Sequence, residues 1–399
     1  MGSQLFFPRG FFLNGIDSGI KDRKKRDIAL IYSQVPCVAA GLFTKNRVKA
    51  APVVISQKHL RNGRAQAILV NSGSANACTG NRGIEDAKTM AYDLACQLGI
   101  RKEDVLLAST GVIGRFLPMS RVKQGIKKIT KTVGNPSKPE FFTEAIMTTD
   151  TTPKIISSQF LTQNRKRAVI CGLAKGAGMI HPDLATLLCF IITDIAIHKR
   201  LLQKALMEAA ETSFNSLTID GDTSTNDSVL ILANGRVGNR PINSENRDFL
   251  KFQNSLNEVT RGLAELIARD GEGATKLVRI IVNNAKNSLS AKKIARHIAS
   301  SPLVKTALYG SDPNWGRLMA AIGSSGIRID PQRIDIYFGK LQVARNGQPT
   351  SYSEMKAKRI LKKKEIEIVI DLKQGTSGAK VYTCDLTPDY VKINSCYST

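Results

Sequence analysis

At residues 175–194 the chain reads Lys175-Gly-Ala-Gly-Met-Ile-His-Pro-Asp-Leu-Ala185 followed directly by Thr186-Leu-Leu-Cys-Phe-Ile-Ile-Thr-Asp194. A glycine-rich loop with one lysine leads into a proline turn, and the apolar run that Thr186 opens predicts a buried strand. One hydroxyl therefore stands at the start of a strand, beside backbone N–H groups that no bulky side chain shields. If the Ala185–Thr186 bond were cut, Thr186 would carry a nucleophilic hydroxyl and, as its base, a new α-amine with an ordinary pKa of about 8.

Cleavage and acyl transfer at this threonine would share one chemistry. In the uncut chain the Thr186 hydroxyl would attack the Ala185 carbonyl, and hydrolysis of the resulting ester would leave fragments 1–185 and 186–399. Both reactions need donors for a tetrahedral oxyanion, and Ser109-Thr110-Gly111 follows a predicted strand with a hydroxyl and a backbone N–H to offer. Each pattern taken alone also fits a structural role: a threonine chosen for β propensity, and an ordinary turn after a strand.

The length and composition of the chain predict two or three domains. It has 399 residues, of which 42% are hydrophobic, enough for packed cores. No apolar run approaches the roughly 18 residues that a membrane span needs. Seven cysteines and four histidines are scattered without metal-binding spacing, a pattern typical of reduced cytosolic proteins. We therefore expect no metal, no membrane segment and a cytoplasmic location.

The formal net charge of +25 is unusual and raises the question of nucleic-acid binding. The cations lie in short clusters such as Lys21–Arg26, Arg165–Arg167 and Lys356–Lys364. No aromatic side chains interleave with them to stack on bases, and no known nucleic-acid-binding motif appears. We interpret the clusters as solvated surfaces and expect no specific nucleic-acid partner. A basic nucleic-acid-binding protein is kept as an alternative from another functional class.

Strand-like and helix-like patterns interleave along the whole chain. Short apolar runs predict strands at 28–32, 38–43, 65–70, 105–108, 228–233 and 277–282, besides the one that Thr186 opens. Helical spacing predicts helices at 84–98, 200–216, 256–266, 288–300 and 352–364. Residues 132–140 are polar, contain two prolines and predict a loop. The interleaving indicates an α/β or α+β fold of layered sheets and helices.

Six blocks in order resemble the ornithine acetyltransferases, also called glutamate N-acetyltransferases, of arginine biosynthesis. In that family the Ala-Thr bond is broken autocatalytically, and the new N-terminal threonine carries the acetyl group. His181, Asp183 and Ser74 depart from the family's usual residues without touching the Ala-Thr pair. The blocks are Asn71–Gly80, Ser109–Gly114, Lys175–Leu188, Ser213–Asp227, Ser311–Arg317 and Asn394–Thr399.

The resemblance implies a fold, a reaction and an assembly. The fold would be the layered α/β, two-domain fold of the ornithine acetyltransferases, with an N-terminal-nucleophile mechanism. N-acetylornithine would acetylate Thr186, and glutamate would then accept the acetyl group, while Thr110 and Gly111 form the oxyanion hole. An α chain (1–185) and a β chain (186–399) would assemble as an α2β2 heterotetramer without a cofactor.

The resemblance also assigns substrate-binding residues. The family binds substrate at a lysine and a glutamate that match Lys175 and Glu272. Lysine suits a carboxylate, and Glu272 suits an amine because flanking glycines let a ligand approach. A threonine between Met147 and Thr151 also contributes, and we prefer Thr148 over Thr149 and Thr151. The remaining assigned residues are Thr186 itself and, in the C-terminal tail, Asn394 and Thr399.

Two alternatives stay open at this point. Bifunctional members of the family also take acetyl groups from acetyl-CoA, whereas monofunctional members do not. An N-terminal-nucleophile amidohydrolase or aminopeptidase would use the same residue types, with water in place of an amine as the acceptor.

Overall fold

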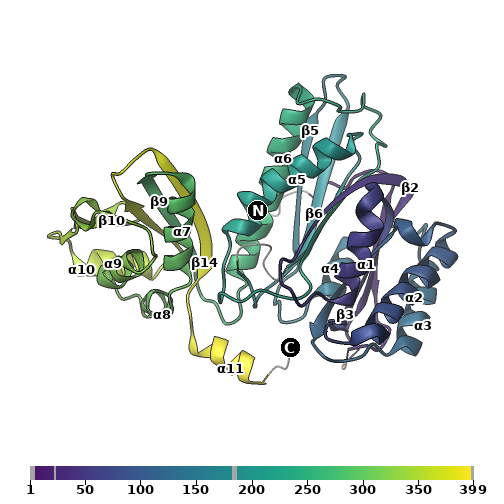
Figure 1. Cartoon of the computed structure of the whole chain (residues 1–399), viewed down its shortest axis with the longest axis horizontal. Helices are drawn as coiled ribbons and strands as arrows, with labels where there is room; N and C mark the ends of the chain where they lie inside the picture. Colours follow the sequence, from purple (N-terminus) through teal and green to yellow (C-terminus); the bar gives the residue numbers. More distant parts are fainter. Residues whose placement is uncertain (1–4, 22–23, 182–186, 397–399) are drawn as a thin grey trace.

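The computed structural model describes residues 5–21, 24–181 and 187–396, which form two lobes. Figure 1 shows a larger lobe around an eight-stranded sheet and a smaller lobe around a six-stranded sheet. Helices cover both sheets, so the mixed α/β class predicted from the sequence is confirmed. Within the described ranges, no helix has the length and apolar character that crossing a membrane requires.

The large sheet has the strand order β4-β3-β2-β8-β7-β6-β5, and β1 pairs with β2. Pairs β3/β4 and β7/β8 are parallel, and the remaining pairs are antiparallel. Because β7 lies between β6 and β8, residues on both sides of positions 185 and 186 belong to one sheet. The strands are β1 (Phe11–Ile16), β2 (Ile28–Phe43), β3 (Arg64–Ser74), β4 (Val105–Val112), β5 (Lys154–Leu161), β6 (Arg167–Lys175), β7 (Leu188–Thr193) and β8 (Ser228–Ala233).

Alternating residues of these strands face two layers of helices. Ile28 and Leu30 pack into the core that α1, α2 and α3 cover, whereas Ala29 and Ile31 face the core that contains α4. Helices α5 and α6 cover the other half of the sheet. The helices are α1 (Ala51–His59), α2 (Gly80–Leu98), α3 (Met119–Thr130), α4 (Pro139–Ile146), α5 (Lys199–Glu211) and α6 (Arg247–Arg269), with short 3-10 turns at Leu60–Asn62, Lys102–Asp104 and Phe214–Ser216.

The small lobe has its own core, in which α7 packs on β9 and β14. From it, α11 (Pro388–Cys396) runs back beneath the large lobe, in yellow in Figure 1. The sheet, in the order β12-β11-β10-β13-β9-β14, consists of β9 (Leu277–Ala285), β10 (Asp335–Phe338), β11 (Leu341–Arg345), β12 (Gln348–Pro349), β13 (Glu365–Asp371) and β14 (Ser377–Cys384). The helices are α7 (Ser288–Ala299), α8 (Pro302–Gly310), α9 (Trp315–Gly323) and α10 (Glu354–Leu361), with a 3-10 turn at Pro331–Arg333.

Two local expectations differ from the structure. The runs 28–32 and 38–43 belong to one strand of 16 residues, because the chain passes Pro36 through a shift of register between Tyr32 and Cys37. A bulge of this kind accommodates a proline without ending the strand. The polar segment 132–140 is a loop only up to residue 138, since Pro139 opens α4, where a missing N–H costs nothing.

Candidate active site

One small pocket gathers six of the nine residues assigned from the sequence. It has a volume of about 70 Å³ and lies where β4, β6, the loops after α4 and α6, and α11 meet. Ala185, Thr186 and Thr399 lie outside the described residues. The six assigned residues that line the pocket are Thr110, Gly111, Thr148, Lys175, Glu272 and Asn394.

The turn at the end of β4 is held in a conformation that requires glycine. Gly111 has φ +126°, and a Cβ atom there would lie 2.5 Å from the carbonyl carbon of Gly73 in β3. Asn226 ties the turn to its neighbours, since its Nδ2 donates to the carbonyl oxygen of Ser109 at 2.8 Å. The Thr110 hydroxyl makes no hydrogen bond to any described residue, and this leaves it available as a donor inside the pocket.

The sheet brings Lys175 close to the start of β7. Lys175 ends β6 and pairs with Leu188, and the N–H of Ser228 in β8 donates to the carbonyl of Leu187 at 3.1 Å. Lys175 is 5% exposed. Burial lowers the pKa of its ammonium below the ordinary value, although the charges of Asp150 and other nearby carboxylates act in the opposite direction. A substrate carboxylate would neutralise this buried cation.

The carboxylate of Glu272 sits directly on the glycine-rich loop. The backbone N–H of Glu272 donates to the carbonyl of Ala177 at 2.8 Å. A Cβ atom at Gly178 would lie 2.4 Å from the carboxyl carbon of Glu272. Asn394 of α11 donates from Nδ2 to Oε2 of Glu272 at 2.8 Å. The C-terminal segment therefore orients one carboxylate oxygen and leaves the other lone pairs for a ligand amine.

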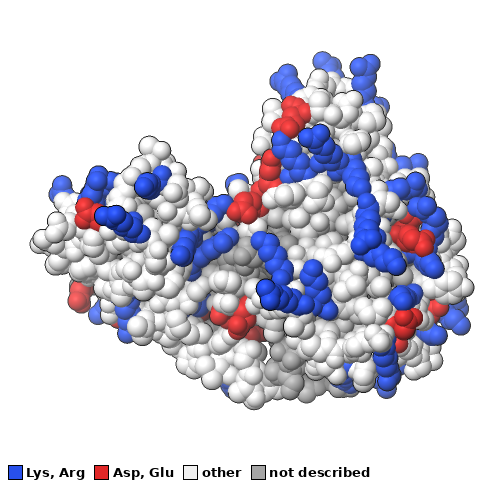
Figure 2. Space-filling view, viewed as in Figure 1, with Lys and Arg blue, Asp and Glu red and all other residues white. Residues whose placement is uncertain are grey.

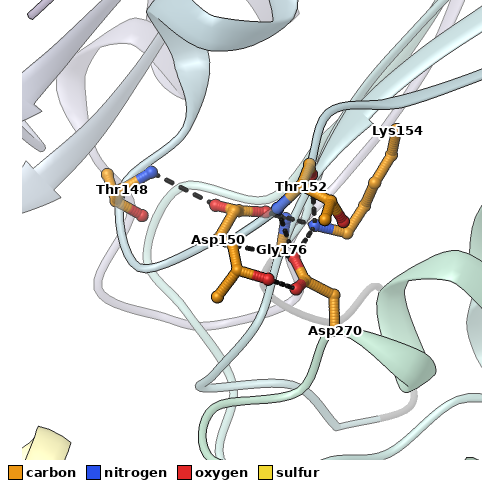
Figure 3. A network of polar contacts seen from close by, with 7 residues as sticks. Thr148, Asp150, Thr152, Lys154, Gly176 and Asp270 are labelled. Atoms are coloured by element: carbon orange, nitrogen blue, oxygen red, sulfur yellow. Dashed lines mark hydrogen bonds and ion pairs between the residues drawn. The ribbon is translucent and has the colours of Figure 1, made fainter.

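A buried ion-pair network joins loops that line the pocket (Figure 3). The Lys154 ammonium lies 2.7 Å from Oδ1 of Asp150 and 2.5 Å from Oδ2 of Asp270, and all three side chains are at most 7% exposed. Asp150 also accepts from the backbone N–H groups of Gly176, at 2.6 Å, and Thr148, at 3.2 Å. The network thus joins the three loops that carry Thr148, Lys175 and Glu272.

Electrostatics keep the Asp150 carboxylate charged. Burial by itself would raise the pKa of Asp150, but Lys175 and Lys154 hold it down at about 2. The sequence analysis did not identify Asp150, Lys154 or Asp270 as site residues. No motif marks them, because a sequence displays charges but not which distant charge each one meets.

The pocket also bears on which threonine faces the substrate. Thr148 and Thr149 both line it. Thr151 is exposed, and its hydroxyl and backbone N–H both donate to Asp270. Ser224 and Asn226 line the pocket as well, although the sequence analysis recognised them only as part of a longer block.

Gly178→Ala is expected to raise KM for an amine-bearing substrate by about tenfold or more, because the methyl group would displace the Glu272 carboxylate from its hydrogen-bonding position. Steady-state kinetics and thermal unfolding check this. Gly323→Ala is the control, since no atom lies within 4 Å of a Cβ atom there. An unchanged KM in Gly178→Ala would contradict the role given to Glu272.

Comparison with known proteins gives one consistent family. The ArgJ family model matches residues 12–399. The curated "Arginine biosynthesis bifunctional protein ArgJ" of Thermotoga neapolitana is 49% identical over 99% of this chain and 100% of its own length. The protein of the same name from Caldanaerobacter subterraneus is 45% identical over 100% of this chain and 99% of its own.

A solved structure agrees. The crystal structure of arginine biosynthesis bifunctional protein ArgJ from Bacillus halodurans is similar with 42% sequence identity and a TM-score of 0.51. The similarity covers 98% of that chain but 52% of this one. Since the family model and the curated relatives extend over nearly the whole sequence, the chain belongs to the ArgJ family, the ornithine acetyltransferases that its sequence blocks resemble.

Proposed function

We propose that this protein transfers an acetyl group from N-acetylornithine to glutamate, giving ornithine and N-acetylglutamate. Membership of the ArgJ family makes it an acyltransferase of arginine biosynthesis. The observation that carries the specific reaction is the single pocket that Thr110, Gly111, Lys175 and Glu272 share. It combines a donor pair for an oxyanion with one cation and one carboxylate for amino-acid substrates.

The proposed reaction begins with self-cleavage. The Thr186 hydroxyl attacks the Ala185 carbonyl, the C–N bond breaks, and the Ala185–Thr186 amide becomes an ester with a free α-amine on Thr186. Water then hydrolyses this ester to the Ala185 carboxylate and the free Thr186 hydroxyl. Then Oγ of Thr186 attacks the acetyl carbonyl of N-acetylornithine. The C–N bond breaks, the α-amine transfers the proton from Oγ to the departing ornithine amine, and acetyl-Thr186 remains. Attack by the glutamate amine regenerates the threonine.

The described residues have roles that fit these steps. The Thr110 hydroxyl and the Gly111 N–H donate to the oxyanion of each tetrahedral intermediate. Lys175 binds an α-carboxylate, and Glu272, oriented by Asn394, binds the substrate amine. Thr148, and from the family resemblance Thr399, which lies outside the described residues, complete the proposed substrate contacts. The proposed chemistry uses these side chains, the Gly111 N–H and the Thr186 α-amine, and we expect no cofactor.

The architecture suits a protein cut into an α chain and a β chain. β7 pairs with β6, and β8 pairs with β2, so two fragments would stay together through a shared sheet. The Bacillus halodurans chain, which aligns almost completely with about half of this one, supports such a division. Assembly as an α2β2 heterotetramer and a cytoplasmic location extend the proposal from the family resemblance.

The charge pattern favours no other function. Figure 2 shows lysine and arginine side chains spread over both lobes on the face in view, rather than along one stripe. The family assignment, made over nearly the whole chain, also disfavours both the nucleic-acid-binding alternative and the amidohydrolase or aminopeptidase alternative.

The experiment that tests the proposal follows labelled acetyl from N-acetylornithine in the presence of glutamate and without coenzyme A. We expect labelled N-acetylglutamate and ornithine in equal amounts. Labelled acetate that forms at the same rate with and without glutamate would show that water is the acceptor, and would replace the proposal with the amidohydrolase alternative.

Thr110→Ala is expected to lower kcat by roughly 10²–10³, because removal of one oxyanion donor has this effect in other enzymes. Substrate affinity should stay nearly unchanged, and self-cleavage should slow as well, since it passes through a similar oxyanion. Single-turnover acetylation of the mature enzyme measures the effect. Thr110→Ser keeps a hydroxyl and should retain most of the rate, whereas an unaltered rate in Thr110→Ala would remove Thr110 from the oxyanion hole.

A further inference from the structure

A larger pocket lies between the two lobes. It has a volume of about 690 Å³, a size typical of small-molecule sites, and shares none of its described lining residues with the active-site pocket. The large lobe contributes the loop after β6 and the end of α5, and the small lobe contributes α7. We call it the interlobe pocket. Its charged and histidine lining residues are His181, Glu211, Lys292, Lys293, Arg296 and His297.

The one acidic side chain among the described lining residues already has partners. Oε1 of Glu211 accepts from the ammonium of Lys292 at 2.5 Å, and Oε2 accepts from Nδ2 of Asn215 at 2.9 Å. Burial by itself would raise the pKa of Glu211, but these hydrogen bonds and the charge of Lys292 hold it below the ordinary value. Glu211 therefore compensates Lys292 and leaves the other cations of the pocket without a bonded carboxylate.

Two cations of the interlobe pocket remain available to a ligand. Lys293 is exposed and forms no ion pair or hydrogen bond with any residue that the structure describes. Arg296 is half-buried and donates from Nη2 to the carbonyl of Asn215 at 2.7 Å. Its Nε is buried without a hydrogen-bond partner among the described residues. An unpaired buried donor on a cation is costly, and an anionic ligand that reached it would remove the cost.

The spacing of these two cations matches a particular kind of anion. Lys293 and Arg296 are three residues apart in α7, so they share one face of the helix with Cβ atoms about 5–6 Å apart. The carboxyl carbons of an extended five-carbon dicarboxylate are about 5 Å apart across four C–C bonds. The planar guanidinium can bind one carboxylate through two parallel hydrogen bonds, and the ammonium can bind the other.

The interlobe pocket is also linked to the glycine-rich loop of the active site. The Thr218 hydroxyl donates to the carbonyl of Ile180 at 3.2 Å, and it lies 3.4 Å from Nδ1 of His181 and 3.4 Å from Oγ of Ser300. His181 and Ser300 both line the interlobe pocket. A ligand there would contact one end of a loop whose other end, at Lys175, lines the active-site pocket.

We propose that the interlobe pocket is a second ligand site, for a dicarboxylate that carries no free amine. N-acetylglutamate belongs to this class, and its status as the product rests on the proposed function. Glutamate differs from it by an ammonium group, which would lie near Lys293 and Arg296, while the Glu211 carboxylate that could attract it is already bonded on both oxygens. The pocket therefore distinguishes the acetylated product from the free amino acid by charge.

The test measures glutarate binding to the purified full chain by calorimetry, with ornithine in excess to occupy the active-site pocket. Lys293→Glu reverses one charge of the interlobe pocket. Lys127→Glu makes the same change on an exposed residue of α3 outside that pocket. We expect Lys293→Glu to lose about tenfold or more in affinity, and Lys127→Glu to change by about twofold or less. Arg296→Lys keeps the charge without the planar fork and should give an intermediate loss.

Other ligands test the chemical class. N-acetylglutamate should bind about as tightly as glutarate, and glutamate about tenfold more weakly. An absence of glutarate binding by the wild-type protein, equal effects of Lys293→Glu and Lys127→Glu, or inorganic phosphate that binds as tightly as glutarate would overturn the inference. Acetyl transfer is measured separately from N-acetylornithine to glutamate. Its absence in the wild-type protein would refute the proposed function and leave the glutarate result unchanged.

Discussion

Thr186→Ala is expected to give one uncut chain of 399 residues that transfers no acetyl group. The substitution removes the hydroxyl that acts as nucleophile in both self-cleavage and acetyl transfer, and no described pocket residue offers a second nucleophile with its own α-amine. Gel electrophoresis of the purified protein and the labelled-acetyl assay measure the two losses.

Thr186→Ser is the matched control for this prediction. It keeps a hydroxyl and, once cut, an α-amine at the same position, so it should form both fragments and retain measurable transfer. If Thr186→Ala were cut like the wild type, or kept activity within about tenfold of it, the nucleophile would have to be another residue.

Lys154→Met is expected to lower the free energy of unfolding by about 3–5 kcal/mol, the usual result when one partner of a buried ion pair is removed. Lys154 is 1% exposed, and its removal takes away the ion-pair partner of Asp270 and leaves Asp150 with only the charge of Lys175. Because Asp150 also holds the loops of Thr148 and Gly176, KM for N-acetylornithine should rise in the folded variant. Urea unfolding and kinetics measure the two effects.

Two further variants isolate the cause of that loss. Lys292→Met removes a lysine whose ion pair with Glu211 is 27% and 46% exposed, so it should cost no more than about 1 kcal/mol. Lys154→Met combined with Asp150→Asn and Asp270→Asn should recover part of the stability, because unpaired buried carboxylates cause much of the loss. A small effect of Lys154→Met, similar to that of Lys292→Met, would contradict the role of the network.

The sequence predicts the reactive and substrate-binding residues of the pocket better than the residues that hold its loops in place. Thr110, Gly111, Lys175 and Glu272 stand in short blocks of recognisable composition, and the structure brings them together around one pocket. Their proximity comes from strand pairing: β4 and β6 end at this point, and the loop after α6 joins them there. The strand predicted at 228–233 matches β8, because its apolar run is bounded by polar residues.

The features that the sequence does not predict are interactions between residues far apart in the chain. Lys154 and Asp270 are separated by 116 positions, and nothing local distinguishes them from charged residues on the surface. The pocket lined by Lys24, Lys25 and Arg115 has the same origin, since Arg115 follows β4 whereas Lys24 and Lys25 precede β2. At Pro36 the sequence predicts a break, because proline usually interrupts a strand. Pairing with neighbouring strands on both sides of the bulge keeps β2 continuous there.

The acetyl-threonine intermediate is the central claim, and intact mass spectrometry tests it most directly. The purified protein should separate into fragments 1–185 and 186–399. After incubation with N-acetylornithine alone, the second fragment should gain one acetyl group on Thr186, and addition of glutamate should remove it. An active protein that stays a single chain, or a second fragment that never carries acetyl while N-acetylglutamate accumulates, would contradict the account.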